Sequence, residues 1–135
     1  MNKSAYEGLQ ENVRSFKTPK IEVWRNQYSD KDYLVRIETD EFTSICPKTG
    51  LPDFALIKVE YIPDKWCIEL KSFKLYLVSY RNVGIFHEHV TNRILEDMVR
   101  ASKPRFMRIE VEYKVRGGIK TLTKAEYIRK GYRVK

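Results

Sequence analysis

Alternation of apolar and polar residues is the clearest pattern along this chain. Residues 105–115 alternate throughout, and their apolar face consists of Met107, Ile109, Val111, Tyr113 and Val115. Residues 54–62 alternate in the same way. A period of two is typical of a strand that buries one face. Both segments are therefore predicted to be strands of a sheet.

Shorter segments supply further predicted strands. Residues 66–70 follow a turn short enough for a hairpin, so we expect them to pair with 54–62. Residues 119–127 follow a Gly-Gly turn and form the last predicted strand. Two earlier segments are rich in β-branched and aromatic residues, and we interpret them as strands or extended arms: 21–24 and 33–38.

Two stretches carry the three- and four-residue spacing of helices instead. From Ser72 onward the apolar stripe is Phe73, Tyr76, Leu77 and Tyr80. Gly84 is predicted to end this helix, because glycine tolerates left-handed geometry. A second helix is predicted over residues 87–102, since Pro104 stops it.

The order strand, strand, helix, helix, strand, strand predicts an α+β fold. We expect a four-stranded antiparallel sheet with both helices on one face. At 135 residues the chain has room for one domain, spanning 1–135, with residues 1–20 as an N-terminal arm outside the core. Exposed sheet edges favour pairing between subunits. We therefore expect a homo-oligomer whose sites lie where the sheets join.

Composition narrows the class of protein. With 42% hydrophobic and 33% charged residues, the chain has the composition of an ordinary soluble protein. No apolar run approaches the roughly 20 residues that cross a membrane, and no signal peptide is evident, so a cytoplasmic location is expected. The net charge of +8 suits a phosphate-bearing partner, either nucleic acid or a phosphorylated cofactor. A merely basic surface explains it equally well.

The two cysteines, Cys46 and Cys67, are expected to be free thiols in a reducing compartment. The sequence contains no C-x-x-C, and its only histidines are His87 and His89, so no metal site is expected. A composite site of both cysteines and one histidine remains open.

The segment from Cys46 to Asp53 places a thiol and a carboxyl group at the ends of a loop stiffened by two prolines. Gly50 allows the loop to turn back tightly. A thiol and an acid on one rigid loop can act as nucleophile and proton donor. The alternative is a surface turn whose cysteine packs inward.

Two further segments have candidate binding chemistry. Lys71 and Lys74, with Ser72 between them, lie at a helix N-terminus, which is suited to phosphate but also typical of a solvated first turn capped by Ser72 or Glu69. In 86–89, a carboxylate could bind the edge of a heterocycle on which Phe86 stacks. Glutamate is also favoured at a helix N-terminus for its charge alone.

Together these segments resemble the 7-cyano-7-deazaguanine reductases, the NADPH-dependent nitrile reductases of queuosine biosynthesis. The matching motifs are I-C-P-K-T-G-L-P-D-F (45–54), E-L-K-S-F-K (69–74), F-H-E-H (86–89) and R-G-G-I (116–119). The resemblance implies the single-module form of the family and the tunnelling fold. It also implies subunits that close into a barrel, commonly a decamer of two stacked pentamers, with sites at their interfaces.

The resemblance also implies roles for individual residues. Cys46 corresponds to the nucleophile that forms a covalent thioimide with the nitrile, and Asp53 to the general acid. The implied substrate-binding residues are Ile68, Glu69, Leu70, Phe86, His87 and Glu88. The implied NADPH-binding residues are Lys71, Ser72, Lys74 and Arg116, and the resemblance allows Arg116 to come from another subunit. Because the chain lacks G-x-G-x-x-G, these residues would replace a Rossmann crevice.

Three other functions are alternatives. A GTP cyclohydrolase would share the fold but needs a zinc site, and the sequence lacks its C-x-x-H pattern. A related amidinotransferase would act on a nitrile in tRNA, but those enzymes lack the E-x-K-S-x-K element. A basic RNA-binding module would explain the charge and leave the Cys46–Asp53 spacing accidental. On the reductase interpretation the partner is a small molecule, and no direct nucleic-acid binding is expected.

Overall fold

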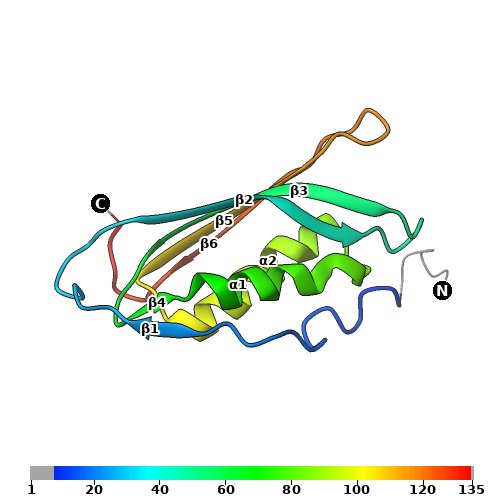
Figure 1. Cartoon of the computed structure of the whole chain (residues 1–135). Helices are drawn as coiled ribbons and strands as arrows, with labels where there is room; N and C mark the ends of the chain where they lie inside the picture. Colours follow the sequence, from blue (N-terminus) through cyan, green and yellow to red (C-terminus); the bar gives the residue numbers. More distant parts are fainter. Residues whose placement is uncertain (1–7, 135) are drawn as a thin grey trace.

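The computed structural model describes residues 8–134 and has two layers, a sheet and a pair of helices (Figure 1). The sheet is antiparallel, with the strand order β2-β3-β5-β6. Its strands are β2 (Val35–Ile45), β3 (Pro52–Ile62), β5 (Phe106–Tyr113) and β6 (Leu122–Ile128). Both helices, α1 (Leu70–Val78) and α2 (His87–Ser102), lie on one face of it. The predicted α+β class is confirmed.

The membership of the sheet differs from the prediction. Residues 66–70 do not pair with 54–62: β4 (Trp66–Ile68) pairs with β1 (Val23–Arg25) in a separate two-stranded sheet. The partner of β3 on that side is β2, in a register that runs from Val35 opposite Tyr61 to Ile45 opposite Pro52. With β5 on its other side, β3 has no free edge for β4.

A bulge explains why β2 is longer than its sequence pattern predicts. The register shifts between Thr39 and Phe42, where the Glu41 N–H donates to the Thr39 hydroxyl at 3.2 Å. Residues 40 and 41 of β2 lie opposite residue 56 alone on β3, and this one extra residue breaks the alternation that marks a strand. Beyond the bulge, Phe42 and Ser44 return to the buried face. The predicted strand therefore stops at residue 38, although β2 continues to Ile45.

The prediction is correct for the second helix and wrong for the end of the first. Helix α2 spans residues 87–102, and Lys103 ends it in left-handed geometry at φ 48°. Helix α1 begins at Leu70, two residues before the predicted start, and passes into a 3-10 turn, η1 (Ser79–Asn82). Gly84 has no left-handed conformation, because it lies in a parallel bridge with Ile45, which needs extended backbone.

The alternating strands bury the predicted faces against the helices. On β3 and β5 the side chains on the face that the helices cover are almost fully buried, and they include Ile57, Val59, Ile109 and Val111. Burying each of them contributes about 2 kcal/mol. Val115 is an exception at 61% exposure, since β5 ends at Tyr113 and the chain continues into an exposed hairpin.

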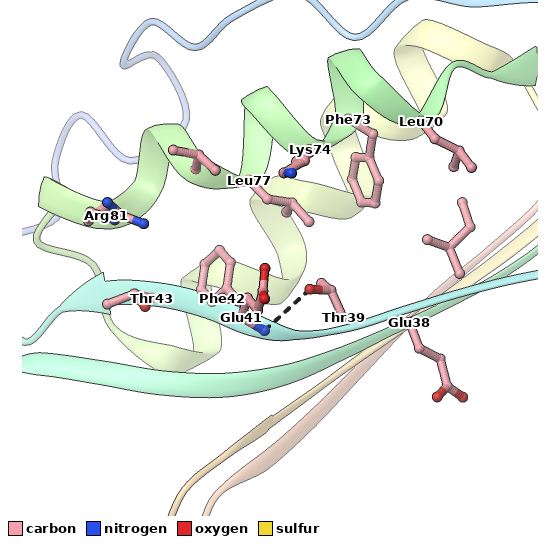
Figure 2. Close-up of a pocket in the computed structure, with 12 residues that line it drawn as sticks. Glu38, Thr39, Glu41, Phe42, Thr43, Leu70, Phe73, Lys74, Leu77 and Arg81 are labelled. Carbon is pink, nitrogen blue, oxygen red and sulfur yellow. Dashed lines mark hydrogen bonds between the residues drawn. The ribbon is translucent and has the colours of Figure 1, made fainter.

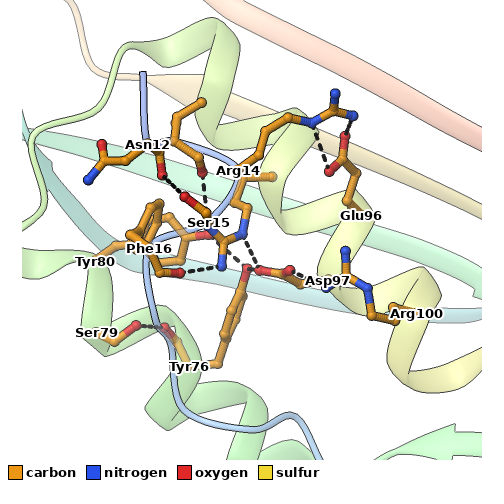
Figure 3. A network of polar contacts seen from close by, with 12 residues as sticks. Asn12, Arg14, Ser15, Phe16, Tyr76, Ser79, Tyr80, Glu96, Asp97 and Arg100 are labelled. Atoms are coloured by element: carbon orange, nitrogen blue, oxygen red, sulfur yellow. Dashed lines mark hydrogen bonds and ion pairs between the residues drawn. The ribbon is translucent and has the colours of Figure 1, made fainter. Parts of the chain in front are cut away.

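The N-terminal arm does not stay outside the core. Residues 1–7 of the predicted arm lie outside the described residues, but Phe16 packs edge-on against Tyr80 at 5.6 Å between ring centroids. Arg93, buried on α2, lies over the Phe16 ring at 4.1 Å and donates a 2.7 Å hydrogen bond to Asp97. Asp97 also accepts a hydrogen bond from Tyr76 (Figure 3). A buried charge network thus attaches the arm to both helices.

Candidate active site

Cys46 lies at the tip of the β2–β3 hairpin. Its N–H donates to the Leu51 carbonyl at 2.9 Å, and the Gly50 N–H donates to the Cys46 carbonyl at 2.9 Å. Gly50 adopts φ +70°, so the tight turn uses a conformation that glycine adopts without strain. The predicted preformed loop is therefore a closed hairpin turn whose first residue carries the thiol.

Hydrogen bonds on both sides of Ile45 attach this hairpin to the segment that leads into α2. The Ile45 N–H donates to the Val83 carbonyl at 2.9 Å, and the Ile85 N–H donates to the Ile45 carbonyl at 3.0 Å. Gly84 lies against Pro47, where an added Cβ would stand 3.7 Å from the proline Cα. These contacts bring Cys46 next to the first turn of α2, although the two are about 40 residues apart.

The surroundings of the Cys46 thiol lower its pKa. The Thr49 hydroxyl makes the largest contribution through its hydrogen bond to the sulfur, and the backbone N–H groups of Thr49 and Lys48 act in the same direction. Partial burial and the negative charge of Asp53 oppose them. No sequence motif near Cys46 indicates what activates this thiol. The turn itself does so, since it directs donors at the sulfur.

Removing the Thr49 hydroxyl should raise the pKa of Cys46. In Thr49→Val the thiolate loses its main hydrogen-bond donor, so a smaller fraction of the thiol is ionised at neutral pH. Alkylation by iodoacetamide should then slow at neutral pH, and the midpoint of its pH profile should move to higher pH. An unchanged midpoint would show that Thr49 does not activate the thiol.

Asp53 is the second residue of β3, and it is 7% exposed. One carboxylate oxygen lies 3.1 Å from Nε2 of His87, and the other forms an ion pair with Arg116. These partners come from α2 and from the hairpin between β5 and β6. Two cationic or hydrogen-bonding groups thus hold the buried carboxyl group in a fixed orientation.

The His87 ring is fixed from two further directions. Its Nδ1 lies 2.6 Å from the Thr121 hydroxyl, and its face stacks on Tyr113 with 3.5 Å between centroids and 4° between planes. Tyr113 itself lies 3.3 Å from the Ser44 hydroxyl. None of these three supporting residues is predicted from the sequence. The alternation predicts only that Tyr113 is a core residue of its strand, and no sequence pattern indicates a role for Thr121 or Ser44.

The predicted substrate-binding residues divide into two groups. Phe86, His87 and Glu88 open α2 beside the Cys46 hairpin, and the Glu88 side chain is exposed. Ile68, Glu69 and Leu70 lie instead at the start of α1. Helix α1 has nine residues and so spans about 14 Å, and the 3-10 turn extends it towards the hairpin. Within one chain the two groups lie at opposite ends of this helix (Figure 1).

Some side chains at the α1 N-terminus are already hydrogen-bonded within the chain, and others are exposed and able to bind a ligand. Glu69 caps the helix, because its carboxylate accepts from the N–H groups of Lys71 and Ser72. The Ser72 hydroxyl is buried between the Glu22 N–H at 2.8 Å and the Glu69 carbonyl at 2.9 Å. Lys71 and Lys74 are exposed on neighbouring turns. Arg116 is remote from this helix end and lies on Asp53.

A groove of about 400 Å³ runs between β2 and α1. Phe42, Phe73 and Leu77 are among its apolar lining residues (Figure 2). Lys74 and Arg81 contribute positive charge, and Glu38 and Glu41 contribute negative charge. This groove contains none of Cys46, Asp53 and His87, so it is separate from the thiol and carboxyl pair.

Comparison with known proteins gives the family. A family model described as QueF-like protein matches residues 52–132, which include Asp53, His87 and Arg116. The chain belongs to the QueF-like family. The resemblance predicted from the four motifs is thereby confirmed. Cys46 lies just outside the matched range, and its place beside Asp53 comes from the hairpin geometry.

Two relatives of this QueF-like chain have the same name, NADPH-dependent 7-cyano-7-deazaguanine reductase. The chain is 54% identical over 112 residues to the NADPH-dependent 7-cyano-7-deazaguanine reductase of Nitrosococcus oceani, covering 83% of this chain and 87% of that protein. The reductase of Chlorobium luteolum is 61% identical over 99 residues, which cover 73% and 85% of the two chains. A solved structure of the archaeosine synthase QueF-Like, in the apo form, matches at TM-score 0.66 and 30% identity. That match covers 71% of this chain and 94% of the other.

Residues 8–134 contain neither a membrane-spanning helix nor a metal-binding cluster. No helix in this part of the QueF-like chain is long and apolar enough to cross a membrane. In the same residues, no three side chains of histidine, cysteine, aspartate or glutamate are grouped closely enough to hold a metal ion.

Proposed function

We propose that this chain is an NADPH-dependent reductase of 7-cyano-7-deazaguanine, which forms 7-aminomethyl-7-deazaguanine for queuosine biosynthesis. The observation that carries the proposal is the pair formed by Cys46, a thiol with a lowered pKa, and Asp53, a buried carboxyl group on the same hairpin. The names of the relatives supply the substrate and the cofactor.

The first chemical step joins the thiol to the substrate. The Cys46 thiolate adds to the nitrile carbon, a C–S bond forms, and the nitrile nitrogen takes up a proton, which gives a covalent thioimide. Asp53 is the proposed proton carrier: its carboxylate accepts the proton of the Cys46 thiol and passes it to the nitrile nitrogen. His87 and Arg116 hold its two oxygens in place. The C–S bond breaks again when the carbon has been partly reduced, and the thiol is regenerated.

The residues at the start of α1 fit part of NADPH. Two molecules of NADPH would each supply one hydride, which together give the four electrons that separate a nitrile from a primary amine. Lys71 and Lys74 are exposed beside a helix N-terminus, a setting that suits phosphate, and Lys74 also lines the groove next to β2. The Ser72 hydroxyl already has two partners within the chain, and Arg116 already contacts Asp53, so their cofactor roles remain predictions.

The division of the site supports an oligomer. Residues 68–70 and 86–88 lie at opposite ends of α1, so a pocket that uses both sets needs a second copy of the chain. Strands β2 and β6 are the outer strands of the sheet and offer unpaired backbone groups. We therefore propose the barrel of two stacked pentamers that the family resemblance implies, with residues 68–70 of one subunit facing Glu88 of the next.

The solved structure of the archaeosine synthase favours a second candidate, a tRNA-directed reaction at the same cysteine. Its identity to this chain is 30%, against 54% and 61% for the two reductases. The E-L-K-S-F-K element at 69–74 also agrees with the reductases. We therefore rank the reductase first.

An activity assay tests the proposal, and three further measurements test the alternatives. The purified protein is mixed with 7-cyano-7-deazaguanine and NADPH, and the loss of NADPH absorbance is followed together with amine formation. The proposal predicts two NADPH oxidised for each amine formed. Activity only on a tRNA that carries the nitrile, without NADPH consumption, would support the archaeosine-synthase alternative. A stoichiometric zinc content would support a cyclohydrolase, and RNA binding without turnover would support a binding module.

A further inference from the structure

The side chain of Gln10 reaches across the segment that carries the proposed substrate-binding residues. Its Oε1 accepts a hydrogen bond from the Phe86 N–H at 3.1 Å and lies 2.7 Å from Nδ1 of His89. Its Nε2 donates to the Gly84 carbonyl at 3.3 Å. One amide group, 74 or more residues away in the sequence, thus holds both sides of Phe86.

The contact with the Phe86 N–H supplies an N-terminal capping acceptor that the residues of helix α2 do not provide. Phe86 is the N-cap residue of α2, and its side chain caps no N–H group. In a capping box, glutamate or glutamine at the third helical position bonds back to the N-cap N–H. Here that position is occupied by His89, and Gln10 supplies the acceptor from the arm instead.

The arm that carries Gln10 is itself fixed along α2. Arg93 donates hydrogen bonds to the carbonyl groups of Val13 at 2.8 Å and Phe16 at 2.7 Å. The Val13 N–H in turn donates to the Gln10 carbonyl at 3.1 Å, which forms a turn. Arg14 also pairs with Glu96 farther along the helix (Figure 3), but this ion pair is exposed and contributes little to holding the arm. Gln10 therefore approaches the first turn of α2 from an anchored segment.

We propose that Gln10 is a positioning residue for substrate binding. By holding Gly84, Phe86 and His89, it fixes the first turn of α2, which carries His87 and Glu88 beside the Cys46 hairpin. Gln10 acts through these residues and takes no part in bond making. The inference rests on the proposed function, since it assigns substrate binding to that turn.

The first test needs no substrate. Hydrogen–deuterium exchange is compared between the wild-type chain and Gln10→Ala, in peptides that cover 84–90. Exchange at the Phe86 amide should accelerate by roughly fivefold or more, the scale of one lost hydrogen bond, while amides in the middle of α2 stay unchanged. The control is Arg14→Ala, which removes an exposed ion pair of the same arm and should leave exchange at 84–90 unchanged.

The second test is kinetic. In Gln10→Ala the KM for 7-cyano-7-deazaguanine should rise by roughly fivefold, with kcat changed less than about twofold, because binding is affected more than the chemistry. Gln10→Glu keeps an acceptor for the Phe86 N–H and should recover part of the loss. A purely structural role would lower the melting temperature without a selective rise in KM.

The outcomes separate this inference from the function on which it rests. A wild-type chain without nitrile reductase activity overturns the proposed function, and the exchange experiment still tests the contact made by Gln10. An active wild type with an unchanged KM in Gln10→Ala overturns the inference alone. Unchanged exchange at the Phe86 amide overturns it as well.

Discussion

Cys46→Ala should lower the rate of NADPH oxidation with 7-cyano-7-deazaguanine by on the order of 10⁴-fold or more, the scale seen when a covalent nucleophile is removed. The thiol is the only group proposed to bond to the nitrile carbon, and a nitrile that is not activated accepts hydride poorly. Steady-state rates, together with the intact mass of the protein after incubation with the base alone, measure this. Wild-type protein should gain the mass of the base, and the variant should not.

Cys67→Ala is the matched control for this variant. Cys67 is 4% exposed on β4, and its sulfur lies 3.7 Å from the Tyr33 hydroxyl, away from the Cys46 hairpin. Its loss should cost about 1 kcal/mol of stability and leave both the mass adduct and the turnover in place. Turnover that persists in Cys46→Ala, or an adduct that disappears only in Cys67→Ala, would refute the assignment of the nucleophile.

Asp53→Asn should lower kcat for the nitrile by about 10²- to 10⁴-fold, the contribution of a positioned general acid. The amide keeps the shape of the side chain but cannot deliver the proton that the nitrile nitrogen requires. The reaction of Cys46 with iodoacetamide needs no such proton. Because the charge of Asp53 raises the pKa of Cys46, its removal should make alkylation at neutral pH faster.

These opposite changes distinguish an acid from a structural residue. Asp53→Asn leaves His87 and Arg116 facing a neutral group, so some loss of stability is expected. If the substitution instead disrupted the hairpin, Cys46 would lose its hydrogen bond from Thr49, and alkylation at neutral pH would become slower instead of faster. Nitrile reduction would then fail because the hairpin is lost. The melting temperature and the alkylation profile are therefore measured on the same sample. Nitrile reduction close to the wild-type rate in Asp53→Asn would exclude the proposed role.

Much of the local structure is predictable because it depends on residues close together in the sequence. The alternation in 54–62 and 105–115 reports which face of a strand is buried, and the stripe in 87–102 does the same for α2. Pro104 follows directly after the residue that ends this helix. The motifs around Cys46 and in 86–89 also indicate the family, which the matched family model confirms.

Pairings between distant segments are harder to predict from the sequence. The sequence favours 66–70 as the partner of β3, because a short turn joins them, yet β2 takes that place across a bulge that hides its alternation. Strand pairing depends on which neighbours bury more surface and leave no edge unpaired, and a local pattern does not contain this information.

The candidate active site also has some features that the sequence predicts and others that depend on the tertiary structure. By itself the sequence determined that one rigid loop carries a thiol and a carboxyl group, since prolines and glycine act locally on the backbone. Only the tertiary structure decided that Asp53 is held by His87 and Arg116, and that Gln10 supports the first turn of α2. Hydrogen bonds and ion pairs act over about 3 Å. Residues 34 to 79 positions apart reach that distance only when the sheet, the helices and the arm have packed together.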